Sequence, residues 1–260
     1  MTCCRTGTTQ LYQRCDSNCF ASAYPLKIMA YHEVVNDRFG DTPVAVTYCP
    51  LCDSAAVFDR SSATGDREFA ASGLLYNNNV LFFSHLQGEQ RSLWSQLKVE
   101  GVTGTCAGIK LDTYPVELTT WKDWRTRNPE TDVLSPDTGF DDDYQQDPYH
   151  EYHQSLQTPM WNAIPAPPTD ILFQKLRVLG VWDPEEHRAK AYCLSEFPDE
   201  ADGTVVIHDV IGDRKVAIAY DPETQSLRVV RTDEGLRWMY AYWFGWYAFF
   251  LHTTVYTQPQ

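Results

Sequence analysis

Two cysteines separated by two residues have the spacing in this sequence that is best suited to chemistry. Cys49 and Cys52 stand in the run Thr-Tyr-Cys-Pro-Leu-Cys at residues 47–52. Cysteines at this spacing can turn both sulfurs toward one point, which a thiolate metal site or a redox disulfide requires. His32 lies upstream, and a neutral imidazole beside two thiolates would give zinc or copper three ligands and one open position. The sequence therefore predicts a copper or zinc site made of Cys49, Cys52 and His32. A structural disulfide or incidental buried thiols remain alternatives for the cysteines, and a hydrogen-bonded histidine within a lobe remains the alternative for His32.

The chain repeats the framework around this pair without repeating the pair. Residues 40–48, Gly-Asp-Thr-Pro-Val-Ala-Val-Thr-Tyr, return as residues 212–220, Gly-Asp-Arg-Lys-Val-Ala-Ile-Ala-Tyr, and Asp221 then replaces the first cysteine. The repeat also places Thr204 where His32 stands. Residues that both copies share are expected to be scaffold, and those found only in the first copy are better candidates for chemistry.

Two further pairs of similar segments extend the repeat. Residues 23–26 resemble residues 191–194, and residues 120–133 align without gaps to residues 242–255. Residues 120–133 and 242–255 each contain two tryptophans three residues apart. Side chains at this spacing share one face of a helix and are expected to pack inward. These tryptophans are Trp121, Trp124, Trp243 and Trp246.

The pattern of strands and turns predicts an α+β, β-rich fold with two unequal duplicated lobes, each a β-hairpin and sheet module closed by one helix. The expected strands are 44–48, 55–59, 67–75, 80–84, 177–182, 216–220 and 226–231. The expected parts are a divergent, Cys-containing N-terminal segment (1–22), a first lobe with the cysteine pair (23–135), an irregular connector (136–170) and a shortened second lobe (171–260).

A segment unique to the first copy adds polar and aromatic side chains that could line a pocket over the cysteine pair. These residues are Tyr76, Asn77, Trp94, Ser95 and Gln96. Turn formation and ordinary packing explain the same residues equally well. His150 and His153 resemble a metal pair, but no third ligand accompanies them, so we expect them on a solvated surface.

The charge of the chain excludes several classes of partner. The net charge is −14, from 35 acidic and 21 basic residues, and the basic residues are scattered along the sequence. This field would repel nucleic acid and anionic membranes. The apolar stretch 236–251 is too short and too aromatic for a membrane span, which needs about 20 apolar residues, and is predicted to be a buried helix. The charge and the sequence leave a small ligand or another protein as the possible partner.

The first residues leave the cellular compartment open. Residues 1–20 contain no apolar run of the secretory type, so no signal peptide is predicted in the chain as given. They contain Cys3, Cys4, Cys15 and Cys19, which could form a disulfide knot or a small metal site. Their spacing matches no established zinc pattern, and a loosely ordered tail with incidental thiols explains them at least as well.

Three functions are compatible with these patterns. The first is soft-metal binding, with catalysis as an extension, and the second is a thiol-disulfide oxidoreductase that uses Cys49 and Cys52. The third is a structural or assembly protein without chemistry. The sequence contains no Gly-rich phosphate loop, nucleophile elbow or His-Glu-x-x-His helix, so it does not decide whether the protein is an enzyme.

Taken together, the motifs resemble those of a widespread prokaryotic family, the domain of unknown function 3179. The matching motifs are residues 23–26, 32–37, 43–52, 72–77, 92–96, 138–140, 148–149 and 242–244. The resemblance implies no established activity. It implies a strand and turn before the first motif, which residues 1–22 do not resemble, and a longer second half. It also implies relatives with export signals, for which an extracytoplasmic location is expected.

Overall fold

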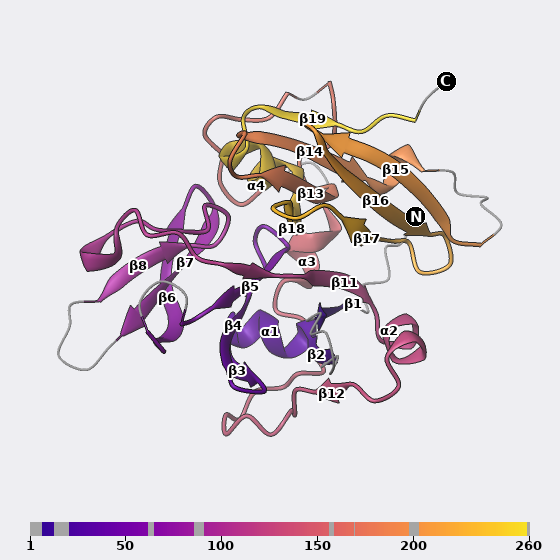
Figure 1. Cartoon of the computed structure of the whole chain (residues 1–260). Helices are drawn as coiled ribbons and strands as arrows, with labels where there is room; N and C mark the ends of the chain where they lie inside the picture. The colour runs from indigo at the N-terminus through magenta and orange to yellow at the C-terminus, as the bar shows by residue number, and fades with distance from the viewer. Residues whose placement is uncertain are drawn as a thin grey trace.

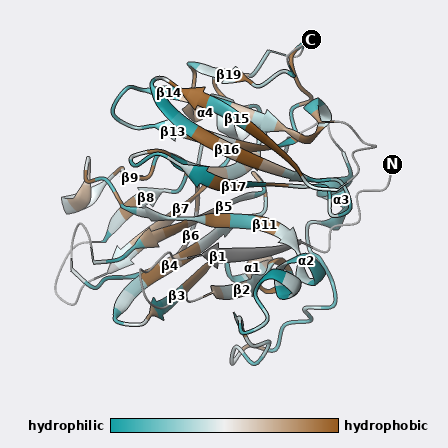
Figure 2. Ribbon diagram, turned by 45° about the vertical axis from the view of Figure 1, so that its right-hand side comes forward, coloured by the Kyte–Doolittle hydropathy of each residue, from teal (hydrophilic) through white to brown (hydrophobic). Residues whose placement is uncertain are grey.

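The computed structural model describes residues 7–12, 21–61, 65–85, 91–155, 159–168, 170–197 and 203–258. These residues form a β-rich fold with few, short helices and several sheets, as predicted. Figure 1 shows the strands of the first half in the lower part of the view, those of the second half in the upper part, and a further sheet at one side. The apolar colour in Figure 2 follows the strands, while the loops are mostly hydrophilic.

The first half contains a four-stranded sheet in the order β11-β1-β2-β12. Strand β1 pairs antiparallel with β2 and β11, and β12 runs parallel to β2. The expectation that residues 1–22 lack a strand before the Ala-Tyr-Pro-Leu motif is therefore wrong, because two neighbouring strands supply the pairing that local preference does not signal. The bounds are β1 (Gly7–Tyr12), β2 (Ala21–Pro25), β11 (Val116–Thr120) and β12 (Asp132–Val133).

The second half repeats this strand order and then continues into the cysteine hairpin. The larger sheet runs β19-β14-β13-β18-β5-β4-β3, with β10 paired to β5. Strand β19 runs parallel to β14, as β12 does to β2. The bounds are β3 (Val34–Phe39), β4 (Thr42–Cys49), β5 (Ser54–Asp59), β10 (Thr113–Tyr114), β13 (Arg177–Asp183), β14 (Arg188–Cys193), β18 (Arg237–Tyr242) and β19 (Thr253–Val255).

Two further sheets complete the fold. The order β15-β16-β17 in the second half matches β3-β4-β5 in the first, and β6-β7-β8-β9 forms an added module. In the second half, β17 is followed directly by β18, so the added module belongs to the first half. The bounds are β6 (Glu68–Tyr76), β7 (Asn79–His85), β8 (Ser92–Ser95), β9 (Glu100–Gly101), β15 (Val205–Ile211), β16 (Arg214–Asp221) and β17 (Ser226–Thr232).

Equivalent hydrogen bonds occur in the two halves. The Trp124 indole donates to the Thr131 hydroxyl at 2.9 Å, and the Trp246 indole donates to the Thr253 hydroxyl at 2.9 Å. The hydroxyl of Tyr24 donates to Asp37 at 2.5 Å, and that of Tyr192 donates to Asp209 at 2.9 Å. These pairs and the matching strand orders support an internal duplication, which itself stays a prediction.

The helices are short and flank the sheets. Helix α2 (Trp121–Arg127) follows β11, and α4 (Trp243–Phe249) follows β18 in the same way. Helix α1 (Leu26–His32), which no sequence pattern indicated, precedes β3, and α3 (His150–Gln154) lies in the connector. Short 3-10 turns occupy Gly104–Cys106 and Leu194–Glu196. No helix among the described residues is both long and apolar enough to cross a membrane.

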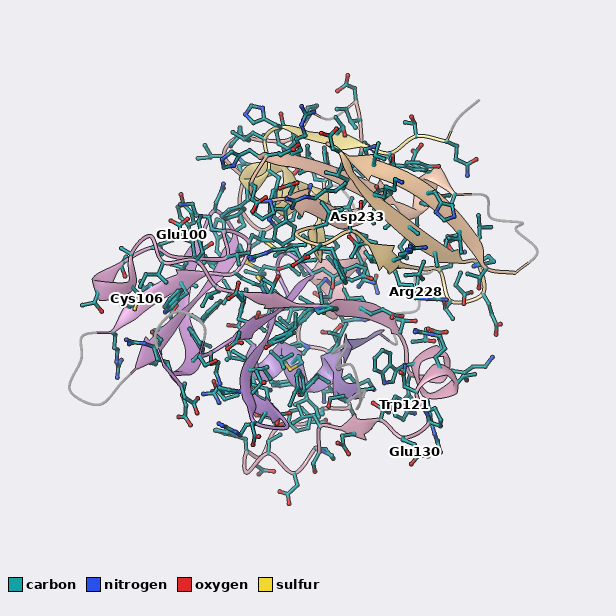
Figure 3. The ribbon with its side chains drawn as sticks, in the orientation of Figure 1. Glu100, Cys106, Trp121, Glu130, Arg228 and Asp233 are labelled. Carbon is teal, nitrogen blue, oxygen red and sulfur yellow. The ribbon has the colours of Figure 1, made fainter. Side chains whose placement is uncertain are left out.

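Two expectations about the aromatic segments are wrong. Residues 236–251 are not one helix, because Arg237–Tyr242 pairs with β13 as strand β18 before α4 begins. Trp121 is 37% exposed, whereas Trp124, Trp243 and Trp246 are at most 1% exposed. The two helices differ in position. Helix α2, which carries Trp121, lies at the edge of the molecule (Figure 3), whereas the α4 tryptophans belong to the core.

Candidate functional site

The cysteine pair lies at the hairpin between β4 and β5, deep in one of the two core clusters. Cys49 and Cys52 are 1% and 0% exposed. They lie 4.2 Å apart and both are free thiols. The Cys52 sulfur is 3.2 Å and the Cys49 sulfur 3.9 Å from the main-chain oxygen of Asn78. Both thiols therefore converge on one carbonyl group.

The two thiols have opposite pKa shifts. Burial by itself would raise the pKa of Cys49, but hydrogen bonds from the Cys52 side chain and from the N–H groups of Cys52 and Val80 outweigh it, so the pKa is lowered. Burial raises the pKa of Cys52 well above its ordinary value, and its hydrogen bond to Cys49 adds to the effect. A proton held by Cys52 thus stabilises a thiolate at Cys49.

Groups from distant parts of the chain hold the turn between the cysteines. The hydroxyl of Tyr152 in α3 donates to the Leu51 carbonyl at 2.8 Å, and the Tyr242 N–H donates to the Cys52 carbonyl at 2.6 Å. Helix α4 packs so closely that a Cβ atom at Gly245 would lie 3.1 Å from the Cys52 sulfur. The position of the pair therefore depends on the connector and on the second half.

A buried ion pair follows the second cysteine. Asp53 is fully buried and has a left-handed backbone, with φ 47°. Its carboxylate accepts hydrogen bonds from the Tyr48 hydroxyl at 2.8 Å and from the Arg177 Nε at 2.7 Å. Burial lowers the pKa of Arg177, but the Asp53 charge outweighs it and raises that pKa. This pair ties the cysteine turn to the first residue of β13.

The side chain of Gln96 joins the cysteine hairpin to the added module. Its amide oxygen accepts from Ser54 at 2.5 Å and from Asn79 at 2.9 Å, and its amide nitrogen donates to Thr47 at 2.9 Å. All four side chains are fully buried. Buried polar groups are tolerated when they satisfy one another in this way, so the network fixes the module against β4 and β5.

The residues expected to line a pocket lie in different surroundings. Gln96 is in the buried network, and Trp94 and Ser95 are fully buried beside it. Tyr76 is 47% exposed, with its ring 5.7 Å from that of Phe249. Asn77 donates to and accepts from the backbone of an exposed connector residue, Ile164.

His32 is engaged by the connector. Its Nε2 lies 2.5 Å from the Tyr144 hydroxyl and 3.8 Å from the Asp142 carboxylate, and its ring contacts Phe140. In the part of the chain that the structure describes, no three His, Cys, Asp or Glu side chains are grouped closely enough to hold a metal ion. The set of Cys49, Cys52 and His32 is therefore not assembled in this conformation.

Glu33 is a partly buried acid near the pair that sequence reasoning missed. It caps α1 with a left-handed backbone, φ 58°, and its carbonyl accepts from the Tyr48 N–H at 2.8 Å. Burial raises the pKa of its carboxyl above the usual 4.5. Its charge opposes the lowering of the Cys49 pKa, and it adds to the burial that raises the pKa of Tyr149.

We expect Glu33→Gln to stabilise the protein more at pH 7 than at pH 4. The folded-state pKa of Glu33 is raised, so its contribution to stability is fully present below the unfolded-state pKa and is lost as the pH rises through the folded-state pKa. Glutamine stays neutral and avoids that loss. Urea unfolding at both pH values measures the effect, with exposed Glu68→Gln as the control. A stability difference that does not change with pH would contradict it.

The sequence held weak signals for some of these residues and none for others. The run Tyr76-Asn77-Asn78-Asn79 indicated a turn, but not that its third residue faces the cysteines. The Asp53 to Arg177 contact spans 124 residues and leaves no local pattern.

His153 is only 8% exposed, with its Nδ1 2.9 Å from the Tyr242 hydroxyl, so the expectation of a solvated surface is wrong for it. The four N-terminal cysteines lie outside the described residues.

Comparison with known proteins gives a family and no activity. A family model described as a protein of unknown function (DUF3179) matches residues 16–237, which is most of the chain. No curated protein and no solved structure matches the chain.

Proposed function

The chain belongs to the DUF3179 family, and from the geometry of its buried cysteine pair we propose that it binds one copper(I) ion through Cys49 and Cys52. The observation that carries this proposal is the convergence of two buried thiols, 4.2 Å apart, on the carbonyl oxygen of Asn78. Metal–sulfur bonds of about 2.3 Å allow two sulfurs on one ion to lie up to about 4.6 Å apart.

The chemistry of the pair favours copper(I) over zinc. Thiolates are soft ligands and select copper(I), whereas zinc normally takes at least three protein ligands. Among the described residues the pair has no third His, Cys, Asp or Glu within metal-binding reach. Binding replaces up to two thiol protons, which are released to solvent, by one ion shared between two thiolates. The lowered pKa of Cys49 makes the first deprotonation easier.

We expect Cys49→Ser to abolish stoichiometric copper(I) binding and to leave the fold intact. The repeated strand β16 forms without a cysteine, so β4 does not need Cys49 to pair. Binding is measured by titrating reduced protein against a chromophoric copper(I) chelator, with protein unfolding followed in parallel. The titration uses a background in which the cysteines outside the described residues are serines: Cys3, Cys4, Cys15 and Cys19.

Cys106→Ser is the matched control for this experiment. Cys106 is 1% exposed, like Cys49, but it lies in the 3-10 turn Gly104–Cys106 after β9, at the left side of the molecule in Figure 3. Its replacement should keep one bound ion per chain. Equal copper content in the wild type and in Cys49→Ser would sink the copper proposal.

A thiol-disulfide function is the second candidate, and the opposite pKa shifts of Cys49 and Cys52 favour it. Oxidation would join the two sulfurs, release two protons and pass two electrons to a small disulfide such as oxidised glutathione, which is reduced to two thiols. Burial of both sulfurs excludes attack on a large protein disulfide without opening of the site.

Equilibration in glutathione buffers separates the two candidates. Formation of a Cys49–Cys52 disulfide, measured by mass spectrometry of alkylated peptides, supports the redox function if copper(I) binding is absent. Copper(I) binding with thiols that stay reduced across the buffer series supports the metal function. A pair that does neither would leave the structural or assembly role.

A further inference from the structure

One stretch of the connector, residues 138–154, is held at both of its ends by other parts of the fold. We call this stretch the strap. Its start contacts the end of α1, and its end, which forms α3, contacts the cysteine turn and the last residue of β18. Among the described residues, no hydrogen bond between main-chain groups joins the strap to the rest of the fold. Side chains therefore fasten it.

His32 fastens the start of the strap. Its Nε2 lies 2.5 Å from the Tyr144 hydroxyl, which is also 2.6 Å from the Thr138 hydroxyl, and its ring lies 5.1 Å from that of Phe140. The ring of Tyr31 packs edge-on against that of Tyr144, with centroids 5.4 Å apart. The last two residues of α1 thus hold the start of the strap.

Tyr152 and His153 fasten the end of the strap beside the cysteine pair. The Tyr152 hydroxyl donates to the Leu51 carbonyl at 2.8 Å. The Nδ1 of His153 lies 2.9 Å from the Tyr242 hydroxyl, and the Tyr242 N–H donates to the Cys52 carbonyl. The end of the strap is thus bound to the cysteine turn directly by one side chain and through Tyr242 by another.

A buried ammonium group keeps Tyr152 in place. Lys175 is 1% exposed, and its Nζ lies 3.6 Å from the centre of the Tyr152 ring and donates to the main-chain oxygen of the same residue. A buried charge is unfavourable unless nearby groups replace the water that it lost, and an aromatic face together with a carbonyl oxygen does so. The position of Tyr152 beside the turn is thus supported by packing from the second half.

The two sulfurs are closed off from solvent while the strap is in place. Cys49 and Cys52 are at most 1% exposed, so neither a metal ion nor a small disulfide reaches them in this conformation. Tyr149 of the strap packs against both core clusters. Burial, followed by the charges of Glu33 and Cys49, raises the pKa of Tyr149, as expected for a ring close to the pair. The strap is thus a cover of the pair that side chains alone hold.

The repeat links His32 to the cysteine pair. His32 is lost from the second copy together with the cysteines, and Thr204 stands in its place. A residue that the shared scaffold needed would be expected in both copies. In the described part of the chain, His32 belongs to no group that could hold a metal ion. Its contacts with the strap supply a different reason for its presence beside the pair.

We propose that the strap is the gate of the cysteine pair and that His32 is its latch. Opening of residues 138–154, with the sheets intact, then admits copper(I) or a small disulfide to the two thiols. Local opening of this kind requires less free energy than global unfolding, because it breaks side-chain contacts only. The identity of what enters rests on the proposed function, whereas the opening itself occurs with or without copper(I).

The test is Tyr144→Phe in the full chain. This variant removes one hydroxyl, which contacts His32 and Thr138 at the end of the strap that is remote from the cysteine turn. Loss of one hydrogen bond should favour the open strap, so alkylation of Cys49 and Cys52 by iodoacetamide at fixed pH should become roughly threefold to tenfold faster. Mass spectrometry of the peptide that contains both cysteines measures this rate. Hydrogen exchange should become faster in residues 138–154 and stay unchanged in β13 and β14.

Tyr192→Phe is the matched control, because it removes one hydroxyl, bonded to Asp209, from the second half. Its alkylation rate should equal that of the wild type, whereas Tyr152→Phe, at the other end of the strap, should raise the rate as Tyr144→Phe does. Equal rates in the wild type and Tyr144→Phe would overturn this inference. Equal rises in Tyr144→Phe and Tyr192→Phe would also overturn it, since global unfolding would then give the access.

The alkylation experiment and the copper(I) titration fail separately. Faster alkylation of Tyr144→Phe in a protein that binds no copper(I) would overturn the copper function and leave the gate standing. One bound copper(I) ion per chain with no change in alkylation would do the reverse.

Discussion

Arg177→Met is expected to lower the free energy of unfolding by roughly 3 kcal/mol, near the lower end of the range for a broken buried ion pair. The Asp53 side chain is fully buried, and the nearer guanidinium nitrogen of Arg177 lies 2.6 Å from it. Methionine keeps most of the apolar stem and removes the cation, so the carboxylate loses its nearest positive charge. The expected loss lies near the lower end because the Arg177 side chain is 28% exposed and solvent partly screens its charge.

Asp53→Asn is the control for this variant. It keeps the size of the side chain and an oxygen that can accept from Tyr48, and it leaves Arg177 with partial access to water. Asp53→Asn should lower the free energy of unfolding clearly less than Arg177→Met does. Urea unfolding measures both variants. If Arg177→Met has wild-type stability, the ion pair does not hold the two halves together.

Trp246→Ala is expected to cost roughly 3–5 kcal/mol, as for other buried aromatic side chains. The indole is fully buried, stacks on Phe250 with ring centroids 3.8 Å apart and donates to the Thr253 hydroxyl. It also lies directly on the backbone of β13, because a Cβ atom at Gly180 would be 2.3 Å from the ring. Removal would leave a cavity that the packed strand cannot close.

Trp121→Ala is the comparison that makes this result specific. Trp121 has the position in α2 that Trp243 has in α4, but it is 37% exposed. Surface substitutions change stability by roughly 0.5 kcal/mol, and a half-buried tryptophan should lie between that and the core value. Thermal and urea unfolding of the two variants decide the matter. Equal losses would show that burial does not distinguish the two helices.

Arg177→Met and Trp246→Ala should also affect the cysteine pair, because the contacts that they remove lie in the elements that hold the turn between the two cysteines. Asp53 follows Cys52 directly, and Gly245 of α4 packs on the Cys52 sulfur. Variants that loosen these contacts should expose the thiols to alkylation before global unfolding. The second half of the chain thus helps to hold the turn of a cysteine pair that belongs to the first half.

The sequence by itself determined the features that depend on local pattern. Short apolar runs bounded by turn residues located the hairpins of β4 and β5 and of β16 and β17, because a strand that is buried on both faces has a continuous run of apolar residues. Comparison of the repeated segments singled out Cys49 and Cys52, because a residue missing from the second copy is not needed by the shared scaffold.

Only the tertiary structure decided which groups meet at the pair. Asn78, Arg177 and Tyr152 reach the cysteine turn from a hairpin, a strand and the connector, and such contacts leave no period in the sequence. The same reason explains why Trp121 and His153 were misplaced. Both occur in patterns that fit a buried and an exposed position equally well, and the choice depends on which distant surface covers them.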